Sequence, residues 1–398
     1  MAGETANFRK RNLVRPVFTP AILIVAAETM LLPVLPVSAI NFGLDLAGAG
    51  ALLACILIGS LVAELPSARV IARFGERKAL IIAGISFAGF AILPAFGLGL
   101  WALILAAVGI GVSQALTGLA RHSLMTSHVP VKYRARALTT LGGMFRVGWT
   151  SGPLIGSVVI GIFGVPATYV FSSMLALLSV LALISYPETR LSVERVVSVN
   201  GVWRVARANS RVLLTLGVAS GILQAARVTR LVGLPLLAVH LGLDPALSAF
   251  LIGITGLIDV VLFPLSGWVM DKFGRIWGTV PTLLLLAITY SLTPLVTDSL
   301  GFTIIAILSG LANSISSGVN MVLGADLAPP ESRAEFLAGY RLMTSVGTTF
   351  SPIALSLLTA LAGIPIAMAL VGSINFLGVW LFFKHLPNHG MARPHIEE

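Results

Sequence analysis

Long apolar runs separated by short polar segments make up most of this chain of 398 residues. A helix that crosses a bilayer needs about 20 predominantly apolar residues, and twelve runs have about that length. The spans are predicted near 17–40, 46–67, 79–97, 99–120, 137–163, 166–186, 212–238, 247–270, 279–297, 300–325, 336–361 and 364–384. The pattern predicts an all-α membrane protein with about twelve transmembrane helices.

The first apolar run, 17–40, follows a basic segment and ends in small residues that resemble the cleavage site of a signal peptide. The run is longer than the apolar region of a signal peptide, and it carries Glu28, Pro33 and Pro36. We therefore interpret it as an uncleaved first helix.

The composition places nearly all of the chain in the bilayer. Hydrophobic residues make up 57% and charged residues 11% of the sequence, whereas about a quarter of the residues of a soluble protein are charged. The formal net charge of +10 does not indicate nucleic-acid binding, because the basic residues lie in short loops between apolar runs. The sequence predicts an N-terminal six-helix half (1–186), a polar linker (187–210) and a C-terminal six-helix half (211–398).

The loops alternate in charge. Basic loops follow the even-numbered spans, and Arg121 is assigned to the loop after the fourth span. The loops near 41–45, 98, 164, 240–246, 298 and 362 contain no Lys or Arg. Short loops rich in Lys and Arg stay on the cytoplasmic side. We therefore predict cytoplasmic termini, a cytoplasmic linker, and a multi-pass protein in the bilayer of the bacterial inner membrane.

The two halves share an internal repeat. Gly75 and Gly274 are 199 residues apart, and so are Pro130 and Pro329. The same offset relates Gly148 and Pro153 to Gly347 and Pro352. Parallel repeats in a membrane protein place a substrate path at their interface. The repeat therefore predicts a transporter made of two pseudo-symmetric six-helix halves.

Charged residues inside the spans are the main candidates for function, since a charge at the centre of a span costs about 2.5–3.5 kcal/mol on insertion scales. Glu28 and Asp259 lie near the middle of the first and eighth spans. Burial favours the neutral form of a carboxylate, which suits a group that takes up and releases a proton. The alternative is a static ion pair with Arg146 or Arg227. Glu64, near the end of the second span, is interpreted as structural.

Three arginines inside spans are candidates for the substrate cavity. Arg227 and Arg230 are three residues apart on the seventh span, so their side chains project from one face. With Arg146 of the fifth span, they could anchor anionic or polar groups of a substrate. The alternative is that Arg227 and Arg230 pair with Asp259 or with carbonyl groups at helix ends.

The segment 267–275 joins the eighth and ninth spans and is predicted to form a tight basic turn. It resembles the loop signature of the major facilitator superfamily, whose glycine, acidic and basic positions are filled by Gly267, Asp271, Lys272, Gly274 and Arg275. The resemblance implies the major facilitator fold and a cytoplasmic gate. In that gate, Asp271 would act as a latch.

The fifth span carries glycines at every fourth residue: Gly148, Gly152 and Gly156, with Pro153 beside them. Such a stripe lets two helix backbones approach closely. The string also resembles the helix-5 signature of proton-coupled antiporters in the same superfamily, although Ser157 replaces its last glycine. This resemblance implies export rather than uptake.

The sequence departs from the family pattern in two places. The copy of the loop signature between the second and third spans has Ala68 for the first glycine and Ala72 for the aspartate. The fourth span has Leu105 about where the family carries a proton-transfer arginine. We therefore expect no coupling through the fourth span and assign the proton to Glu28 and Asp259.

Signatures of other classes are missing from the sequence. It contains no phosphate-binding glycine–lysine loop of an ATP-driven pump and no His/Cys/acid cluster with metal-ligand spacing. We therefore expect neither a cofactor nor a metal nor an enzymatic activity. The sequence predicts a monomeric secondary transporter that exports small organic, drug-like compounds in exchange for protons by alternating access. The alternatives are uptake or exchange of an organic anion and, in another class, a polytopic enzyme or receptor that transports nothing.

Overall fold

The computed structural model describes residues 18–128, 131–184, 199–316 and 318–386. Within these ranges all regular structure is helical, and twelve helical segments are long and apolar enough to cross a membrane. The predicted all-α fold with twelve spans is therefore confirmed. The chain divides into two compact units: unit 1 comprises Met1–Glu194 with Asp244–Gly256, and unit 2 comprises Arg195–Leu243 with Leu257–Glu398.

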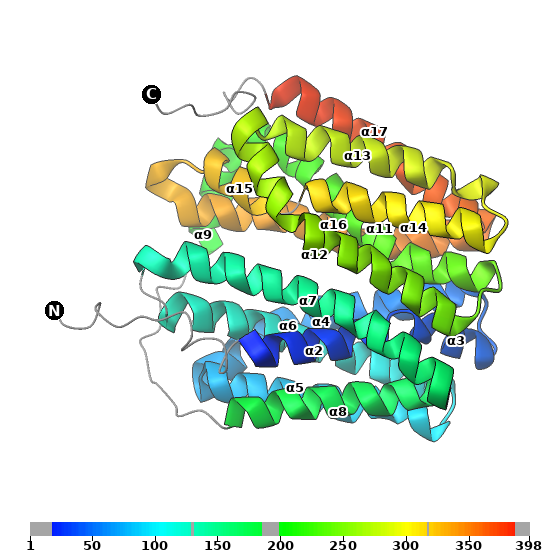
Figure 1. The fold of residues 1–398 in the computed structure, drawn as a ribbon. Helices are drawn as coiled ribbons and strands as arrows, with labels where there is room; N and C mark the ends of the chain where they lie inside the picture. Colours follow the sequence, from blue (N-terminus) through cyan, green and yellow to red (C-terminus); the bar gives the residue numbers. More distant parts are fainter. Residues whose placement is uncertain (1–17, 129–130, 185–198, 317, 387–398) are drawn as a thin grey trace. The chain divides into compact units, whose positions relative to one another are not determined.

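The helices of unit 1 run side by side along most of their length (Figure 1). They are α2 (Thr19–Met30), α3 (Val34–Asn41), α4 (Leu46–Phe74), α5 (Glu76–Ile92), α6 (Leu100–His128), α7 (Val131–Phe163) and α8 (Val165–Ile184). Helix α2 packs against α7 and α8, and α6 packs against α4 and α5. Small residues such as Ala27, Ala83 and Ala106 are fully buried at these contacts, which allows close packing of helices in lipid.

Unit 2 repeats this arrangement. Its helices are α9 (Val199–Ala208), α10 (Ser210–Val212), α11 (Val218–His240), the later part of α12 (Pro245–Phe273), α13 (Ile276–Ser291), α14 (Ser299–Ile315), α15 (Val319–Leu327), α16 (Arg333–Ala362) and α17 (Ile364–His385). Helix α11 packs against α16 and α17 as α2 packs against α7 and α8, and α13 packs against α14 and α17 as α5 packs against α6 and α8.

The backbone carries the same repeat at its turns. Glycines with positive φ recur at an offset of 199 residues, in the pairs Gly43/Gly242, Gly75/Gly274 and Gly164/Gly363. This conformation is strained for residues with a Cβ atom. The carboxylates of Asp45 and Asp244, also 199 apart, each accept a hydrogen bond from the backbone N–H three residues later, at 2.7 and 2.9 Å. Both halves therefore begin their second span with the same N-cap.

The first span is not one continuous helix. Helix α2 ends at Met30 and α3 begins at Val34, and the intervening residues form tighter i→i+3 bonds such as Leu31 N–H to the Glu28 carbonyl. Pro33 and Pro36 cause the interruption, because proline lacks the N–H that a continuous helix requires. Glu28 consequently lies in the last turn of α2.

The tenth predicted span is also interrupted. Helix α14 ends at Ile315, and Gly318, with φ of +79°, precedes α15. The segment 300–325 was predicted to form one continuous helix. Hydropathy does not register the break, because the residues on both sides are equally suited to the membrane.

Several helices extend beyond their predicted ends. Helix α4 continues to Phe74, α6 to His128 and α12 to Phe273, and α7 starts at Val131. Residues assigned to loops, Arg121 among them, therefore lie on helices. The prediction followed apolar content, whereas a helix can continue past the hydrocarbon layer where its side chains are polar. The linker prediction also missed α9, which occupies part of 187–210.

Candidate functional site

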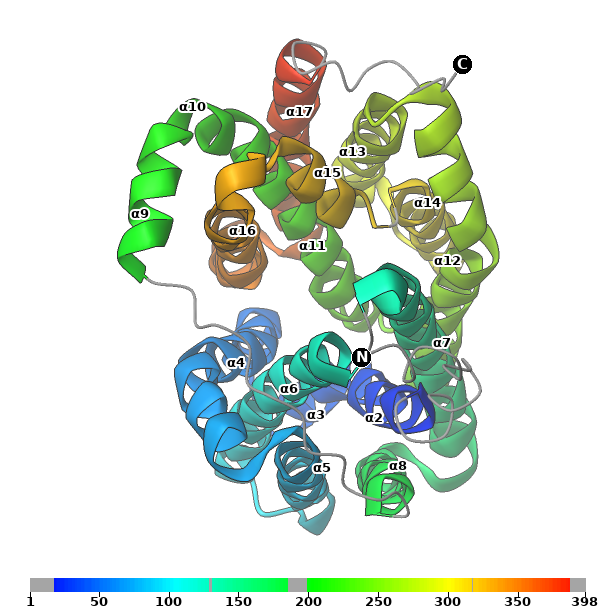
Figure 2. The same cartoon turned by 90° about the vertical axis from the view of Figure 1, so that its left-hand side faces the viewer.

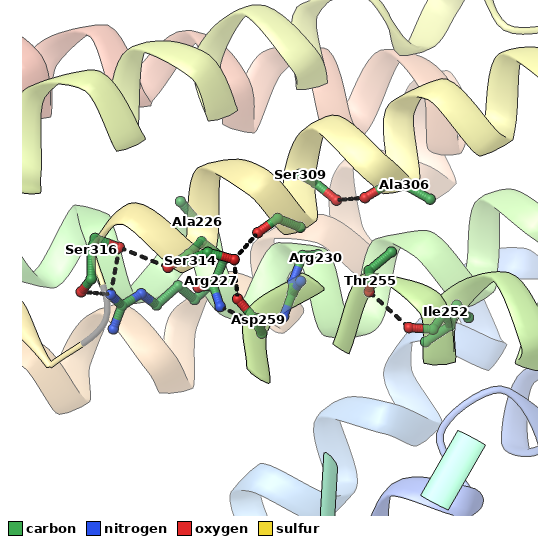
Figure 3. Close-up of polar contacts among 12 residues, drawn as sticks. Ala226, Arg227, Arg230, Ile252, Thr255, Asp259, Ala306, Ser309, Ser314 and Ser316 are labelled. Atoms are coloured by element: carbon green, nitrogen blue, oxygen red, sulfur yellow. Dashed lines mark hydrogen bonds and ion pairs between the residues drawn. The ribbon is translucent and has the colours of Figure 1, made fainter. Parts of the chain in front are cut away.

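A buried polar cluster in unit 2 is centred on Asp259 of α12 (Figure 3). One carboxylate oxygen accepts hydrogen bonds from Arg230 Nη2 at 3.0 Å and Asn313 Nδ2 at 2.7 Å, and the other accepts one from Ser314 Oγ at 2.9 Å. The side chains of Arg230 and Asp259 are only 7% and 4% exposed. The Asp259 carboxylate is thus matched by one guanidinium and two neutral donors.

Arg227 lies next to this cluster and contacts the interruption between α14 and α15. Its Nη2 donates to the carbonyl and to the hydroxyl of Ser316, both at 2.6 Å, and its Nη1 donates to Gln224 Oε1 at 2.9 Å. Ser316 is the C-cap of α14. A cation at that position is favoured by the partial negative charge of the helix C-terminus.

The charges of the cluster do not cancel. Arg227 and Arg230 carry two positive charges against one negative charge on Asp259. Two further buried donors of Arg230, Nε and Nη1, have no hydrogen-bond partner among the described residues. Of the alternatives weighed from the sequence, the geometry matches pairing of Arg230 with Asp259 and of Arg227 with a helix end.

Unit 1 holds the other candidate acid. Glu28 is half-buried on α2, and no hydrogen bond or ion pair of its carboxylate occurs within the described part of the chain. Arg121 of α6 is close enough for its charge to act on Glu28. Arg121 is only 6% exposed, and its guanidinium lies 4.9 Å from the centre of the Phe145 ring, a cation–π contact. Glu28 therefore faces a buried positive charge without being bonded to it.

Arg121 also lines a small cavity of about 20 Å³ among α2, α5, α6 and α8. A cavity of this size can hold about one water molecule. Thr117 and Ser179 contribute hydroxyl groups to its wall, and Pro20, Ile24 and Leu80 contribute apolar surface. The guanidinium of Arg121 is therefore placed beside space that suits a buried water.

The glycine stripe of the fifth span faces α2, the helix that carries Glu28. A Cβ atom at Gly152 would lie 2.5 Å from the Ala26 carbonyl oxygen, and one at Gly148 would lie 2.7 Å from Val25 Cβ. A Cβ atom at Gly156 would lie 3.1 Å from Met30 Cγ. The stripe therefore allows α7 to lie directly against α2. Pro153 lies inside α7, which continues through it to Phe163.

Arg146 and Glu64 are the remaining charged candidates inside the spans. Arg146 is half-buried on α7, in the same unit as Glu28, whereas Arg227 and Arg230 belong to unit 2. Glu64 is exposed on α4. No group of three or more possible metal ligands occurs in the described ranges of the chain.

The loop signature forms an ion-pair network at the junction of α12 and α13. Arg275 donates to Asp271 Oδ1 at 2.9 Å and to Asp326 Oδ2 of α15 at 3.1 Å. Partial burial would lower the pKa of Arg275, but its hydrogen bonds to both aspartates outweigh that effect and raise it above the usual value. The Lys272 ammonium lies 4.9 Å from the centre of the Trp268 ring.

This segment is less of a loop than the sequence suggested. Gly267, Asp271 and Lys272 lie on α12, and only Gly274 and Arg275 separate α12 from α13. Gly274 has φ of +93°, which favours glycine at the turn. The predicted tight turn is therefore confined to two residues, because the polar end of α12 remains helical.

The corresponding junction of unit 1 uses different contacts. Arg77 donates to the Leu183 and Ile184 carbonyls at 3.2 and 2.8 Å and thereby caps the C-terminus of α8. Glu76 accepts a hydrogen bond from Ser123 of α6 at 3.0 Å. Glu76 occupies the repeat position of Arg275, so the two units place opposite charges at this turn.

Arg121 is the functional candidate that the sequence analysis missed. It was assigned to a loop because it follows the apolar part of the fourth span. The internal repeat offered a signal, because Arg121 is aligned with Asn320, which lies on a helix of the second half.

The fold is similar to those of solved transporters. A D-xylose–proton symporter superposes with a TM-score of 0.70 at 18% identity, covering 94% of this chain and 98% of that chain. A POT family transporter in complex with a thioalcohol-conjugated peptide gives a TM-score of 0.77 at 12% identity, covering 95% and 96%. These similarities concern the fold.

Curated proteins are similar over shorter stretches. Magnetosome protein MamH of Paramagnetospirillum magneticum is 27% identical over 141 residues, which is 33% of each chain. The class H tetracycline resistance protein of Pasteurella multocida is 29% identical over 119 residues, 30% of this chain and 29% of that protein. The 4-hydroxybenzoate transporter PcaK of Pseudomonas putida is 25% identical over 152 residues, 37% and 34%. The chain spans about a third of the length of these relatives.

A family model gives the broadest match. The model described as Major Facilitator Superfamily matches residues 17–258 and 216–397, which together cover nearly all of the chain. The twelve spans and the repeat of six-helix units agree with that match. The chain therefore belongs to the Major Facilitator Superfamily and is a membrane transporter rather than an enzyme.

Proposed function

We propose that this transporter exports a small organic, drug-like compound in exchange for protons, by alternating access. Glu28 carries the proton. The observation that carries this proposal is the contrast between the two acids inside the spans. Asp259 receives three hydrogen bonds, one of them from Arg230, whereas Glu28 has only the charge of Arg121 acting on it across a distance. We therefore assign the proton to Glu28, the acid whose carboxylate is held by no hydrogen bond within the described part of the chain.

The pairing of Glu28 with Arg121 gives the exchange a physical basis. When Glu28 is ionised, the two opposite charges attract each other and stabilise the arrangement in which Glu28 of α2 lies near Arg121 of α6. When Glu28 takes up a proton, Arg121 is left as a buried positive charge without a counter-charge, which is costly. Protonation therefore changes the relative stability of two arrangements of the unit, as a coupling step requires.

The direction of transport is supported by two observations. The glycine stripe of α7 matches the antiporter-like pattern and packs on α2, next to Glu28. Over about a third of its length, the chain is also similar to a tetracycline resistance protein. We assign the protein to the bacterial inner membrane as a monomer with cytoplasmic termini, an orientation supported by the alternating charge of the loops.

In this proposal the remaining candidates have positional roles. Arg146, Arg227 and Arg230 set a positive field along the substrate path. The network of Asp271, Arg275 and Asp326 joins the ends of α12, α13 and α15, as a latch on the cytoplasmic gate would.

The test uses inverted membrane vesicles with an imposed proton gradient, a pH-sensitive dye and a panel of cationic, neutral and anionic compounds. We expect at least one compound to collapse the gradient with the native protein and to have no effect with Glu28→Gln. Asp259→Asn is the matched control, because it also removes one buried negative charge. Its proton flux per folded molecule should persist. Failure of every compound, or proton flux that survives Glu28→Gln, would overturn the proposal.

One observation favours a second candidate, uptake or exchange of an organic anion. The cluster of unit 2 has one positive charge in excess, and two donors of Arg230 are unpartnered among the described residues. The similarity to a 4-hydroxybenzoate transporter over about a third of the chain agrees with this candidate. Accumulation of a labelled aromatic acid by intact cells, abolished by Arg230→Gln and retained by Glu28→Gln, would replace the export proposal.

A further inference from the structure

Helix α9 lies on the chain immediately before a membrane span. It ends at Ala208, and the seventh span begins two residues later at Ser210. In the end-on view of Figure 2, α16 is seen along its axis whereas α9 lies in the plane of the picture. The helix therefore crosses the end of unit 2 instead of running with its spans. A single residue, Asn209, separates it from the candidate span.

One side of α9 is attached to the rest of unit 2. A Cβ atom at Gly339 of α16 would lie 3.6 Å from Ala206 Cβ, so the two helices are in contact there. Val205 and Ala206 are half-buried. The helix is thus held in place by packing, and its opposite side remains available.

The available side combines an aromatic residue with arginines. Trp203 is 69% exposed, and Arg204 and Arg207 are exposed as well. Arg207 follows Trp203 by about one helical turn, so both project from neighbouring positions on the same side. Arg211, just beyond α9, is also exposed.

The arginines of α9 have no acidic neighbour on the segment that follows them. From Val199 to His240 the chain contains no Asp or Glu. The exposed arginines take part in no ion pair within the described ranges. A partner for this surface must therefore be negatively charged, and it must accept an indole ring beside the charge.

We propose that α9 is an interfacial helix that binds anionic lipid headgroups through Arg204 and Arg207, with Trp203 at the level of the headgroups. Tryptophan is enriched at that level because its ring is amphipathic. Clusters of basic residues next to a span are attracted to anionic lipids. We favour an anionic lipid over an acidic protein, because only Asn209 separates α9 from the candidate span that begins at Ser210. The inference is independent of the transported compound and of Glu28.

The size of the effect follows from the charge count. Each basic residue near an anionic surface contributes about 1 kcal/mol, which corresponds to a preference of about fivefold. Two arginines give a preference of about 25-fold for an anionic headgroup over a zwitterionic one, if their contributions add. Arg211 would increase the preference further.

The test measures which lipid touches Trp203 in the intact protein. The full chain is placed in nanodiscs that contain brominated phosphatidylglycerol or brominated phosphatidylcholine, each of which quenches nearby tryptophans. The sequence has 6 tryptophans, so the Trp203 signal is the difference between the native protein and Trp203→Phe. We expect half-maximal quenching at a roughly 25-fold lower fraction of the brominated phosphatidylglycerol.

The variant and its control carry the same change of charge. Arg204→Gln with Arg207→Gln should bring the two half-maximal fractions together. Arg69→Gln with Lys384→Gln removes two positive charges from exposed sites on α4 and α17 and should leave the preference unchanged. Equal quenching by both lipids in the native protein would overturn the proposal, and so would a preference that survives the Arg204/Arg207 change. Absence of quenching by either lipid would overturn it too, since Trp203 would then face water or another protein.

Discussion

Arg230 and Asp259, which form an ion pair, should be strongly coupled in their effects on the stability of unit 2. The two groups are 3.0 Å apart and almost fully buried. Removing one partner of such a pair typically costs about 3–5 kcal/mol, because the other charge stays buried without compensation. We expect this cost for Asp259→Ala and for Arg230→Met, each made alone.

The double variant should be less harmful than the sum of the two. With both charges removed, no uncompensated charge is left, and the main remaining loss is the Asn313 amide, whose bond to Asp259 is 2.7 Å long. Ser314 keeps its second bond, to the Gly310 carbonyl at 2.8 Å. An unsatisfied neutral donor costs about 1–3 kcal/mol. The coupling energy of the cycle should therefore be at least about 2 kcal/mol.

The assay is unfolding of the purified protein in mixed micelles by increasing fractions of sodium dodecyl sulfate, read by circular dichroism. A double-mutant cycle isolates the pairwise term. Arg275→Gln with Asp271→Asn is the matched control, because that pair has a similar separation of 2.9 Å but a 78% exposed carboxylate. Its coupling should be about 1 kcal/mol or less. Additive effects at Arg230 and Asp259 would refute the buried pair.

Three further predictions concern packing, the latch and a helix end. Gly152→Ala should destabilise the folded protein by about 1–3 kcal/mol in the same assay, since the added Cβ would lie 2.5 Å from the Ala26 carbonyl oxygen. The control is Gly161→Ala on the same helix, whose Cβ would meet no atom within 4 Å, and it should cause no loss of stability. Because the pKa of Arg275 is raised, its contribution to stability is complete at every pH below its unfolded pKa and is lost only at higher, strongly alkaline pH. A cysteine introduced near the latch should therefore be labelled in the native protein at the same fraction of its denatured-state rate at about pH 7 and about pH 10, the denatured protein at each pH correcting for the thiolate fraction. A rise in that ratio would contradict the prediction. Arg77→Ala should lower the free energy of unfolding by about 1–2 kcal/mol, because the hydrogen bonds to the Leu183 and Ile184 carbonyls are lost. Lys78→Ala, at the exposed neighbouring position, should change it by no more than about 0.5 kcal/mol. Equal losses of stability would show that Arg77 does not cap α8.

The fold could be predicted from the sequence because the bilayer imposes a simple rule on length and hydropathy. All twelve spans were predicted in this way. The repeat was visible in the spacing of Gly75 and Gly274, which both have a positive φ in the structure. The interruption of α14 and α15 at Gly318 was not found. It changes neither length nor hydropathy, and it depends on backbone geometry that one glycine permits.

The contacts of the candidate site were less predictable, because they depend on how each helix is rotated. Asp259 could have paired with Arg146, Arg227 or Arg230 on sequence grounds, and only the structure selects Arg230. The end of the fourth span posed a different difficulty. A buried Arg121 cannot be distinguished from a loop arginine by hydropathy, since both follow the same apolar run.

The repeat also shows why the proton site belongs to one half of the transporter in our proposal. Glu28 and Arg227 are 199 residues apart and occupy equivalent positions on α2 and α11. At this position, unit 1 presents an acid near the positive charge of Arg121, and unit 2 presents a base bonded to the helix end at Ser316. An arginine stays charged throughout a transport cycle, because its guanidinium loses its proton only far above physiological pH. A carboxyl group can change its charge when burial and a neighbouring cation balance each other. The two equivalent positions therefore differ in function: a proton can change the charge at Glu28 in one half, whereas Arg227 keeps a fixed positive charge in the other half. Substitution of Arg227 by glutamate would remove that difference and leave the twelve-span fold in place.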